Sequence, residues 1–352
     1  MILGFLIGGI LLSWLTNILL LRFSQSLGIR NKNDVVIRWS NQSKPSLGGV
    51  SFFVVFMFAA IVFLVIGTND NFFKSYEYIG LFTAASLAFL MGLADDAYNT
   101  KPLLKLGVQI ACGILFCLTG TVIELTHVYA VDSIVTVVWV VIIMNSLNML
   151  DNMDGITGTT VLFILLSCLF GSWIINGIVW DIWSITLVSM IGAVLGFLYF
   201  NIHPSKLFMG DAGSQFIGLF VAFFGVKYLW NIGPITQNHS WTGIVLALTA
   251  FAPAAADTLS VVINRLKRGQ SPMVGGKDHT THHLVYSGLN DRQVWYVFTL
   301  IGFTSLVLSL ALIKLVEMDI ILPVAFLPLY FLFVFLLLYR NTIRYPEPLR
   351  KN

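Results

Sequence analysis

Long apolar stretches recur along the whole chain, and they constrain its fold more than any other feature. A helix that crosses a bilayer needs about 20 mostly apolar residues. The 352 residues contain eleven such stretches, at 2–22, 46–67, 78–94, 103–122, 130–148, 158–177, 182–200, 212–230, 242–263, 294–314 and 320–339. The sequence therefore predicts an all-α, polytopic integral membrane protein with eleven transmembrane helices and no separate soluble domain.

Charged residues are scarce in this chain. They make up 11% of it, against 57% hydrophobic residues and a mean hydropathy of +0.86. A soluble domain is about 25% charged and covers its surface with polar groups. The composition therefore excludes a soluble enzyme, a disordered chain and a nucleic-acid binder. The net charge of +3 is too small to indicate a polyanionic partner, so the placement of the charges carries the information.

The basic residues predict the orientation, because short cytoplasmic loops are enriched in lysine and arginine. With the N-terminus outside and the C-terminus in the cytoplasm, 17 of the 20 basic residues lie inside. The three that lie outside are Lys74, Lys227 and Lys314. A missed or extra span would degrade this division, so it supports both the orientation and the count of eleven.

Two adjacent carboxylates, Asp95 and Asp96, close the third stretch in the segment GLADDAYN. Neighbouring negative charges repel each other, and the repulsion is stronger near a membrane. A bound divalent cation or a shared proton would relieve it. A solvated helix end is the alternative interpretation.

A second polar cluster follows the fifth stretch in the segment NSLNMLDNMDGITG. Its polar residues recur every three positions, at Asn145, Asn148, Asp151 and Asp154. A 3₁₀ turn or an unwound helix end would align them on one side. The spacing favours a helix terminus that wraps polar groups around a ligand over an ordinary polar loop.

The eighth stretch opens with the segment FMGDAGS, in which Gly210 and Gly213 flank Asp211. A helix N-terminus attracts phosphate, and aspartate is a ligand for hard cations. The segment is therefore a candidate anion and metal site. Helix capping by Asp211 or Ser214 is the alternative.

The long connection 264–293 combines basic residues with three histidines, His279, His282 and His283. No cysteine or HExxH motif accompanies them, so a phosphate-binding loop is favoured over a zinc site. A solvated cytoplasmic loop is the alternative. Just before it, Asp257 lies inside a predicted span, where Pro253 is expected to break the helix and let Asp257 face a cavity.

Together these clusters place hard-cation ligands and phosphate-binding cations on one membrane face. That combination indicates Mg²⁺ and a pyrophosphate, the requirements of phosphoryl transfer, and a site at the membrane surface suggests a lipid substrate. A secondary transporter would instead show internal repeats and polar residues at the middle of its spans.

The motifs resemble the polyprenyl-phosphate N-acetylhexosamine-1-phosphate transferase family, which is related to the phospho-N-acetylmuramoyl-pentapeptide transferases. The resemblance runs from KPSLGG at 44–49 to HHLVYSGL at 282–289, with DDAYN, NSLNMLDNMDGITG and FMGDAGS in this order between them. It implies one membrane-embedded transferase domain. The active site is then formed by the cytoplasmic loops 23–45, 95–102, 149–157, 201–211 and 264–293.

The resemblance implies a reaction and its participants. A UDP-N-acetylhexosamine and undecaprenyl phosphate would give the undecaprenyl-diphospho-sugar and UMP, as the first membrane step of a cell-envelope polysaccharide such as the O-antigen of lipopolysaccharide. Mg²⁺ is the implied cofactor, with Mn²⁺ as an alternative, and the site faces the cytoplasm in the bacterial inner membrane. A homodimer and the muramoyl-pentapeptide reaction stay open as alternatives.

Residue roles are implied only at matching positions. Asp211 resembles the Mg²⁺ ligand, and Asp95 and Asp96 resemble a pair that engages the lipid phosphate, one of them removing its proton. The implied nucleotide-sugar contacts are Lys44, Asn148, Asp151, Asp154 and Phe208, with Phe208 stacked on uracil. The implied diphosphate contacts are Arg265, His282 and His283. The family often has a His-x-His-His pattern where this chain has DHTTHHL, so His279 lacks a secure counterpart.

Overall fold

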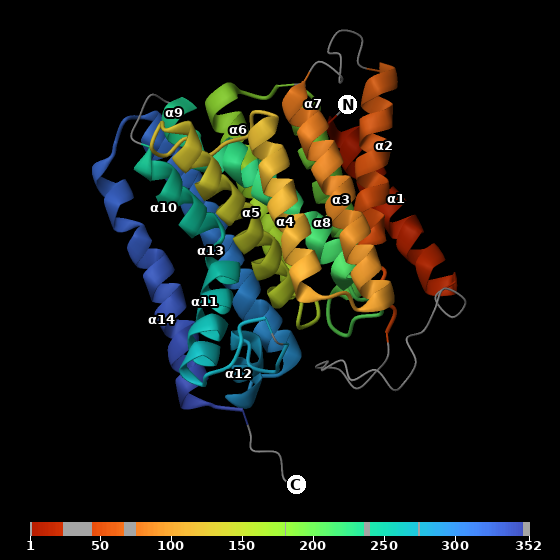
Figure 1. Cartoon of the computed structure of the whole chain (residues 1–352), viewed down its shortest axis with the longest axis vertical. Coiled ribbons are helices and arrows are strands. Elements are labelled where there is room, and N and C mark those ends of the chain that lie inside the picture. The colour runs from red at the N-terminus through yellow and green to blue at the C-terminus, as the bar shows by residue number, and fades with distance from the viewer. Residues whose placement is uncertain are drawn as a thin grey trace.

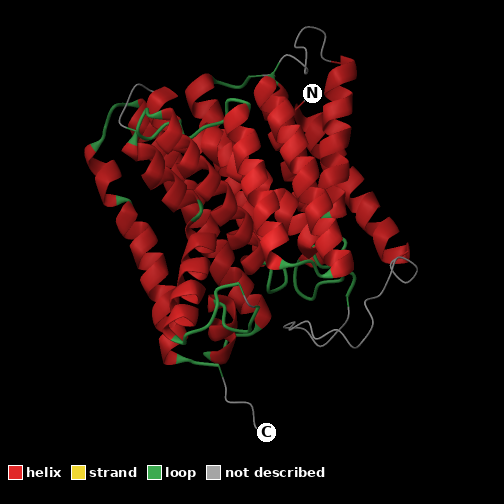
Figure 2. Cartoon of the chain, in the orientation of Figure 1, coloured by secondary structure: helices red, strands yellow, loops and turns green. Residues whose placement is uncertain are grey.

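The computed structural model describes residues 2–23, 44–66, 75–179, 181–235, 240–273 and 275–347. Within these ranges the regular elements are helices and no strand is present (Figures 1 and 2). The first half contains α1 (Ile2–Phe23), α2 (Val50–Ile66), α3 (Tyr76–Tyr98), α4 (Pro102–Leu118), α5 (Tyr129–Leu150), α6 (Ile156–Asn176) and α7 (Ile182–Asn201). The second half contains α8 (Gly210–Gly225), the π-helical turn η2 (Val226–Trp230), α9 (Ile232–Ile235), α10 (Trp241–Ala250), α11 (Ala252–Lys267), α12 (Thr280–Tyr286), α13 (Asp291–Glu317), the 3₁₀ turn η3 (Leu322–Phe326) and α14 (Pro328–Arg344).

Each of the eleven predicted stretches contains helix, and eight of them form helices that are long and apolar enough to cross a membrane. Among the described residues, the bent pair α10 and α11 adds a ninth span if the two helices together cross the membrane once. The remaining two stretches form the shorter apolar helices α2 and α4. The prediction of an all-α polytopic membrane protein is confirmed, while the count of eleven spans stays a prediction.

The predicted span 242–263 is not one straight helix. It divides at Phe251 into α10 and α11, which meet at an angle of 84°. Pro253 lies in the first turn of α11, where proline is tolerated although it cannot continue a preceding helix. The break at Pro253 was therefore predicted correctly, and it swings α11 away from the direction of α10.

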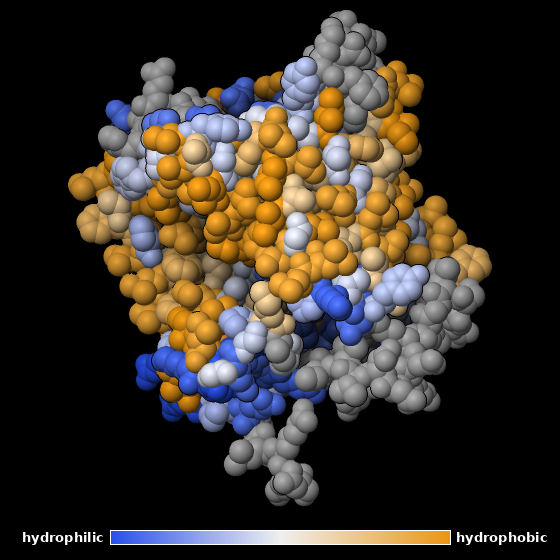
Figure 3. Space-filling model, viewed as in Figure 1, coloured by the Kyte–Doolittle hydropathy of each residue, from blue (hydrophilic) through white to orange (hydrophobic). Residues whose placement is uncertain are grey.

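The centre of the bundle lies at α7 and α8. In the segment Gly210–Trp230, 94% of the residues that form the candidate span are buried, whereas the value for α1 and for the last helix is 17%. Large apolar side chains cover the outer helices, and Figure 3 shows an apolar belt around their middle with hydrophilic residues gathered at the lower end. Apolar surface of this extent suits contact with lipid.

Several helix connections meet at that lower end (Figure 1). They join α3 to α4, α5 to α6, α7 to α8, and α11 through α12 to α13. The predicted site loops 95–102, 149–157, 201–211 and 264–293 therefore lie at one end of the bundle. Of the fifth predicted loop, 23–45, the part 24–43 lies outside the described residues.

Candidate active site

The adjacent carboxylates at the end of α3 are held by different groups. Asp95 accepts hydrogen bonds from the backbone N–H and the hydroxyl of Thr100, at 2.9 and 2.6 Å, and its Oδ2 lies 2.7 Å from Lys105 Nζ. Asp96 Oδ2 accepts the backbone N–H of Ala212, at 2.9 Å, in the first turn of α8. A lysine and a helix N-terminus thus offset the repulsion that the sequence indicates, one for each carboxylate.

Asp211 lies in the first turn of α8 and contacts side chains from α4 and α5. Its Oδ1 accepts the side-chain amide of Asn148, at 2.5 Å, and lies 3.2 Å from Lys105 Nζ. Asn148 also donates to Ser214 Oγ, at 2.8 Å. The residue predicted to bind metal and one residue predicted to bind nucleotide are therefore in direct contact.

Close backbone packing fixes the turn that presents Asp211. Gly210 has a φ of 76°, which glycine adopts without strain. A Cβ added to Gly49 would lie 1.9 Å from Gly213 Cα, and the Gly49 N–H donates to the Met209 carbonyl at 2.9 Å. The segment KPSLGG therefore holds the segment FMGDAGS through its backbone, and a larger residue at position 49 would displace this turn.

Asp151 follows directly after α5 and faces other carboxylates. Burial raises the pKa of this carboxyl, and the negative charges of Asp211 and Asp96 raise it further, to about 7. We refer to Asp95, Asp96, Asp151 and Asp211 as the acidic cluster. Lys105 contacts two of its members, and the negative charges of two members add to the effect of burial on the pKa of Asp151.

The acidic cluster offers the oxygen donors that Mg²⁺ takes. Within the described ranges, no group of three or more His, Cys, Asp or Glu side chains is arranged to hold a metal ion. Mg²⁺ at phosphate sites needs fewer protein ligands, because one or two carboxylates suffice when water and substrate phosphates complete its shell. The carboxylate of Asp211, with Asp151 and Asp96 near enough to interact with it and with each other electrostatically, fits such an ion.

A second set of predicted residues meets where the connection 202–209 packs against the segment 44–49. Lys44 Nζ lies 3.1 Å from Ser205 Oγ, 3.8 Å from Asp154 Oδ2 and 5.2 Å from the centre of the Phe208 ring. Asp154 accepts the backbone N–H and the hydroxyl of Ser205, at 3.0 and 2.7 Å. Three of the predicted nucleotide contacts, Lys44, Asp154 and Phe208, are thus neighbours.

Arg265 lies in the last turn of α11, and its side chain binds residues of the loop between α11 and α12. Its Nε and Nη2 donate to Asp278, at 3.0 and 2.7 Å, its Nη1 donates to the Pro272 carbonyl, at 2.8 Å, and Arg268 also donates to Asp278. Burial raises the pKa of Asp278, but the hydrogen bonds and charge of Arg265 outweigh it and lower the pKa to about 2. Beside this pair lies a polar cavity of about 270 Å³, lined by Arg265, Arg268, Gln270, Ser271, Gly275, Gly276, Lys277, Asp278 and Glu347.

His282 and His283 lie buried in α12. Burial lowers the pKa of His282, and the nearby His279 lowers it further, to about 3, while burial also lowers the pKa of His283. Both rings are therefore neutral near pH 7. The Nδ1 of His283 donates to the Tyr345 carbonyl, at 2.6 Å, which leaves Nε2 as an acceptor in the neutral ring.

His279, whose role the sequence leaves open, is held by Asp257. The His279 Nδ1 lies 2.9 Å from Asp257 Oδ2, and Asp257 Oδ1 accepts the backbone N–H and the hydroxyl of Thr280, at 2.8 and 2.6 Å. The expectation that Asp257 faces a cavity is therefore wrong, because this carboxylate fastens the first turn of α12 to α11. Thr281 Oγ1 donates to Asn152 Oδ1, at 2.6 Å, and so links α12 to the turn after α5.

Three residues in the site were not singled out from the sequence. Lys105 contacts the acidic cluster, Ser205 joins Lys44 to Asp154, and His203 Nδ1 lies 3.2 Å from Asp154 Oδ2. A signal for Lys105 was present, since it is a charged residue inside the inner end of a predicted span. Ser205 and His203 carry no comparable signal.

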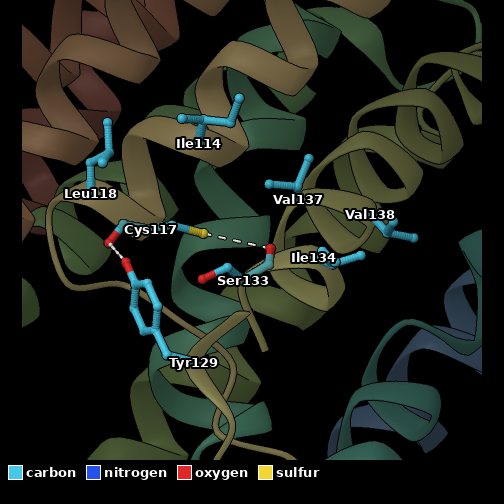
Figure 4. A pocket seen from close by; sticks show the side chains of 8 residues that line it. All are labelled: Ile114, Cys117, Leu118, Tyr129, Ser133, Ile134, Val137 and Val138. Carbon is cyan, nitrogen blue, oxygen red and sulfur yellow. Dashed lines mark hydrogen bonds between the residues drawn. The ribbon is translucent and has the colours of Figure 1, made fainter. Parts of the chain in front are cut away.

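An apolar groove of about 390 Å³ lies between α4 and α5 (Figure 4). It is lined by Ile114, Cys117, Leu118, Tyr129, Ser133, Ile134, Val137 and Val138. These residues belong to the end of α4 and the start of α5, whereas the acidic cluster uses the start of α4 and the end of α5. The groove is therefore at the opposite end of the same helix pair and offers no group for phosphate chemistry.

The fold and the site define a multi-pass membrane protein with candidate phosphate- and cation-binding residues at one end of its helices. The family model described as glycosyl transferase family 4 matches residues 78–229, which include the whole acidic cluster. The matched segment is less than half of the chain, and with the relatives described next it shows that the chain is similar to glycosyl transferase family 4.

Three relatives illustrate the similarity. The chain is 36% identical to the decaprenyl-phosphate N-acetylglucosaminephosphotransferase of Mycolicibacterium smegmatis, over 31% of this chain and 28% of that protein. It is 27% identical to the undecaprenyl-phosphate alpha-N-acetylglucosaminyl 1-phosphate transferase of Escherichia coli O157:H7, over 73% of this chain and 69% of that protein. It is also 27% identical to the phospho-N-acetylmuramoyl-pentapeptide-transferase of Campylobacter hominis, over 37% of this chain and 34% of that protein. The similarity to the first and third therefore spans about a third of their length.

Proposed function

We propose that this protein transfers an N-acetylhexosamine-1-phosphate from a UDP-sugar to undecaprenyl phosphate and releases UMP. The acidic cluster carries this proposal, because phosphoryl transfer depends on positioning phosphates and neutralising their charge. The names of the M. smegmatis and E. coli relatives support it, since both describe N-acetylglucosamine phosphate transfer to a polyprenyl phosphate. The reaction would be the first membrane step of a cell-envelope polysaccharide pathway such as that of O-antigen lipopolysaccharide.

Mg²⁺ is the proposed cofactor, with Mn²⁺ as an alternative. Asp211 would hold the cation, with Asn148 positioning the Asp211 carboxylate through its side-chain amide. When bound, it supplies neutralisation of the diphosphate, a contribution of several kcal/mol to the stability of the transition state.

The proposed reaction joins a lipid phosphate oxygen to the β-phosphorus of the UDP-sugar. The bond between this phosphorus and the bridging oxygen breaks, and UMP leaves with that oxygen. Asp95 or Asp96 is the proposed acceptor of a proton from the lipid phosphate, and Lys105, 2.7 Å from Asp95 Oδ2, is the cation beside this pair. Asp96 positions the start of α8, since it accepts the Ala212 N–H.

The proposed nucleotide subsite is formed by the neighbouring residues Lys44, Asp154 and Phe208. The ammonium of Lys44 already lies over the Phe208 ring, so uracil stacking on this ring would extend a stack that begins with a cation. Arg265, His282 and His283 are the proposed contacts of the diphosphate. The neutral His282 ring would donate from Nε2, because its Nδ1 accepts the His279 N–H, whereas His283 would first have to gain a proton on Nε2.

We also propose that the chain spans the bacterial inner membrane eleven times, with its N-terminus outside and the site in the cytoplasm. The helical content of all eleven stretches supports this topology. Lys101 and Lys206, which the topology places inside, lie on the connections at the site end, and Arg265, also placed inside, lies in the last turn of α11.

An assay of the purified protein tests this function. The protein is incubated with undecaprenyl phosphate, Mg²⁺ and each of a panel of UDP-sugars, and UMP is measured. We expect release with at least one UDP-N-acetylhexosamine. Release only with UDP-muramoyl-pentapeptide would favour the reaction named for the C. hominis relative, and release with none would contradict the proposal. A transporter is disfavoured because the acidic cluster lies at helix ends rather than at their middle.

A further inference from the structure

Lys105 reaches the acidic cluster from the beginning of α4. Its Nζ lies 2.7 Å from Asp95 Oδ2 and 3.2 Å from Asp211 Oδ1. The side chain of Lys105 is 17% exposed and those of Asp95 and Asp211 are 11% and 28% exposed, so solvent screens these contacts less than it screens a surface ion pair. A single ammonium group is therefore shared by carboxylates from two other helices.

The Lys105 ammonium contacts Asp211, the carboxylate that the proposed function assigns to the metal. Lys105 Nζ and Asn148 Nδ2 both lie against the same atom, Asp211 Oδ1. A divalent cation bound by Asp211 would stand close to that ammonium, and two positive charges at such a separation repel each other. The lysine and the cation therefore compete for Asp211.

We propose that Lys105 is the built-in counter-ion of the metal site, bound to Asp211 in the metal-free protein and released to Asp95 when a divalent cation is present. The proposal rests on the proposed function, which assigns the metal to Asp211. Asp95 makes the exchange favourable, because it already holds the ammonium at the shorter of the two distances. The lysine thereby keeps a carboxylate partner in both states.

A counter-ion and a purely structural lysine differ in the sign of their effect on metal affinity. Removing a competing charge strengthens metal binding, by about tenfold for a unit charge that faces a divalent ion across several ångströms of wet protein. Removing a lysine that only organises the carboxylates weakens metal binding. If Lys105 competes with the metal, Asp95→Asn should weaken metal binding, whereas Lys105→Gln should strengthen it. In Asp95→Asn the lysine has lost its second carboxylate partner and pairs more strongly with Asp211.

The test measures Mn²⁺ binding to the full-length protein in detergent by electron paramagnetic resonance, without substrates. We expect Lys105→Gln to bind Mn²⁺ about tenfold more tightly than the wild type and Asp95→Asn to bind it more weakly. Lys105→Arg keeps the charge and should stay near the wild-type affinity. Lys101→Gln is the matched control, because Lys101 is exposed at the start of the same helix, and its removal should change the affinity less than twofold.

The outcomes separate this proposal from the proposed function. Mn²⁺ binding that Asp211→Asn abolishes supports the metal assignment. If the wild type shows no Asp211-dependent binding, the metal assignment fails and the counter-ion role fails with it. If the wild type binds Mn²⁺ through Asp211 but Lys105→Gln binds it equally or more weakly, the counter-ion role alone is overturned. Should Lys105→Gln not fold, Lys105→Met takes its place in the same measurement, where tighter Mn²⁺ binding supports the role and equal or weaker binding overturns it.

Discussion

The two ends of the helical bundle both hold charged side chains, and they balance charge differently. At the end opposite the site, Glu77 Oε2 lies 2.6 Å from Lys227 Nζ, and this lysine lies 4.3 Å from the centre of the Trp183 ring. At the same end, Asp181 caps α7 by accepting the Ser184 N–H at 2.8 Å. These acids are each matched by a cation or by a helix end.

At the site end, the acidic cluster gathers four carboxylates, and Lys105 contacts two of them. Burial, and after it the negative charges of Asp211 and Asp96, raise the pKa of Asp151 to about 7, a perturbation expected where a carboxyl is buried beside like charges. The acids at the opposite end have partners within the protein, whereas the crowded acids at the site end fit the cation proposed above. Substitutions at the two ends test this difference.

The largest effect is expected for Asp211→Asn. Losing this carboxylate should lower UMP release at saturating Mg²⁺ by about a thousandfold, because metal neutralisation contributes several kcal/mol, while the thermal unfolding midpoint stays near that of the wild type. Glu77→Gln at the opposite end is the matched control and should change turnover less than threefold. Near wild-type turnover of Asp211→Asn would remove Asp211 from the metal site.

A smaller effect is expected in the pH dependence of UDP-sugar binding. His283 is neutral with its proton on Nδ1, so Nε2 must gain a proton before it can donate to a phosphate oxygen. Binding then takes up a proton, and KM should rise with pH between 6.5 and 8, by at most about tenfold per unit. His283→Gln should flatten this profile, and a wild-type KM that is independent of pH would argue against a contact between His283 and the diphosphate.

Asp151→Asn is expected to have a modest effect on stability. The pKa of Asp151 is raised from 3.8 to about 7 in the folded protein, so its carboxyl increasingly destabilises the fold as the pH rises from 4 to 7. The substitution should therefore raise the unfolding midpoint of the metal-free protein, by about 2 °C at pH 8 and by less at pH 5. A gain at pH 5 as large as the gain at pH 8, or larger, would show that burial and the neighbouring carboxylates do not raise this pKa.

The smallest effect is expected at the opposite end, for the pair Glu77 and Lys227. A double-mutant cycle with Glu77→Gln and Lys227→Met should give a coupling of about 1 kcal/mol or less, since both side chains are partly exposed. Thermal unfolding of the four proteins measures it. A coupling several times larger, or a loss of turnover in these variants, would contradict the view that charged residues at this end contribute little to stability and nothing to catalysis.

The sequence was sufficient to predict the helices and the end at which the polar clusters meet. Apolar stretches must become helices in a bilayer, because every backbone group needs a partner there. The juxtaposition of Lys44, Asp154 and Phe208 was anticipated only through the family resemblance, which implies all three as nucleotide contacts. Sequence spacing alone predicts that the polar clusters share one end of the bundle when the helices alternate in direction.

Individual partners could not be predicted in the same way. Asp95 and Asp96 are adjacent, yet one faces Lys105 and the other the Ala212 N–H, because successive residues on a helix point about 100° apart and meet different neighbours. Asp257 contacts His279 only because α11 is bent away from α10. Such contacts depend on the rotation and tilt of whole helices, which the apolar pattern does not specify.

The most direct test of this account identifies the nucleotide that leaves the UDP-sugar. The purified protein is incubated with UDP-N-acetylglucosamine, undecaprenyl phosphate and Mg²⁺, and the nucleotide and lipid products are separated and measured. The account predicts UMP and an undecaprenyl-diphospho-sugar in equal amounts, and neither product when Mg²⁺ or the lipid phosphate is omitted. Release of UDP, which would mean transfer of the sugar without its phosphate, would contradict it.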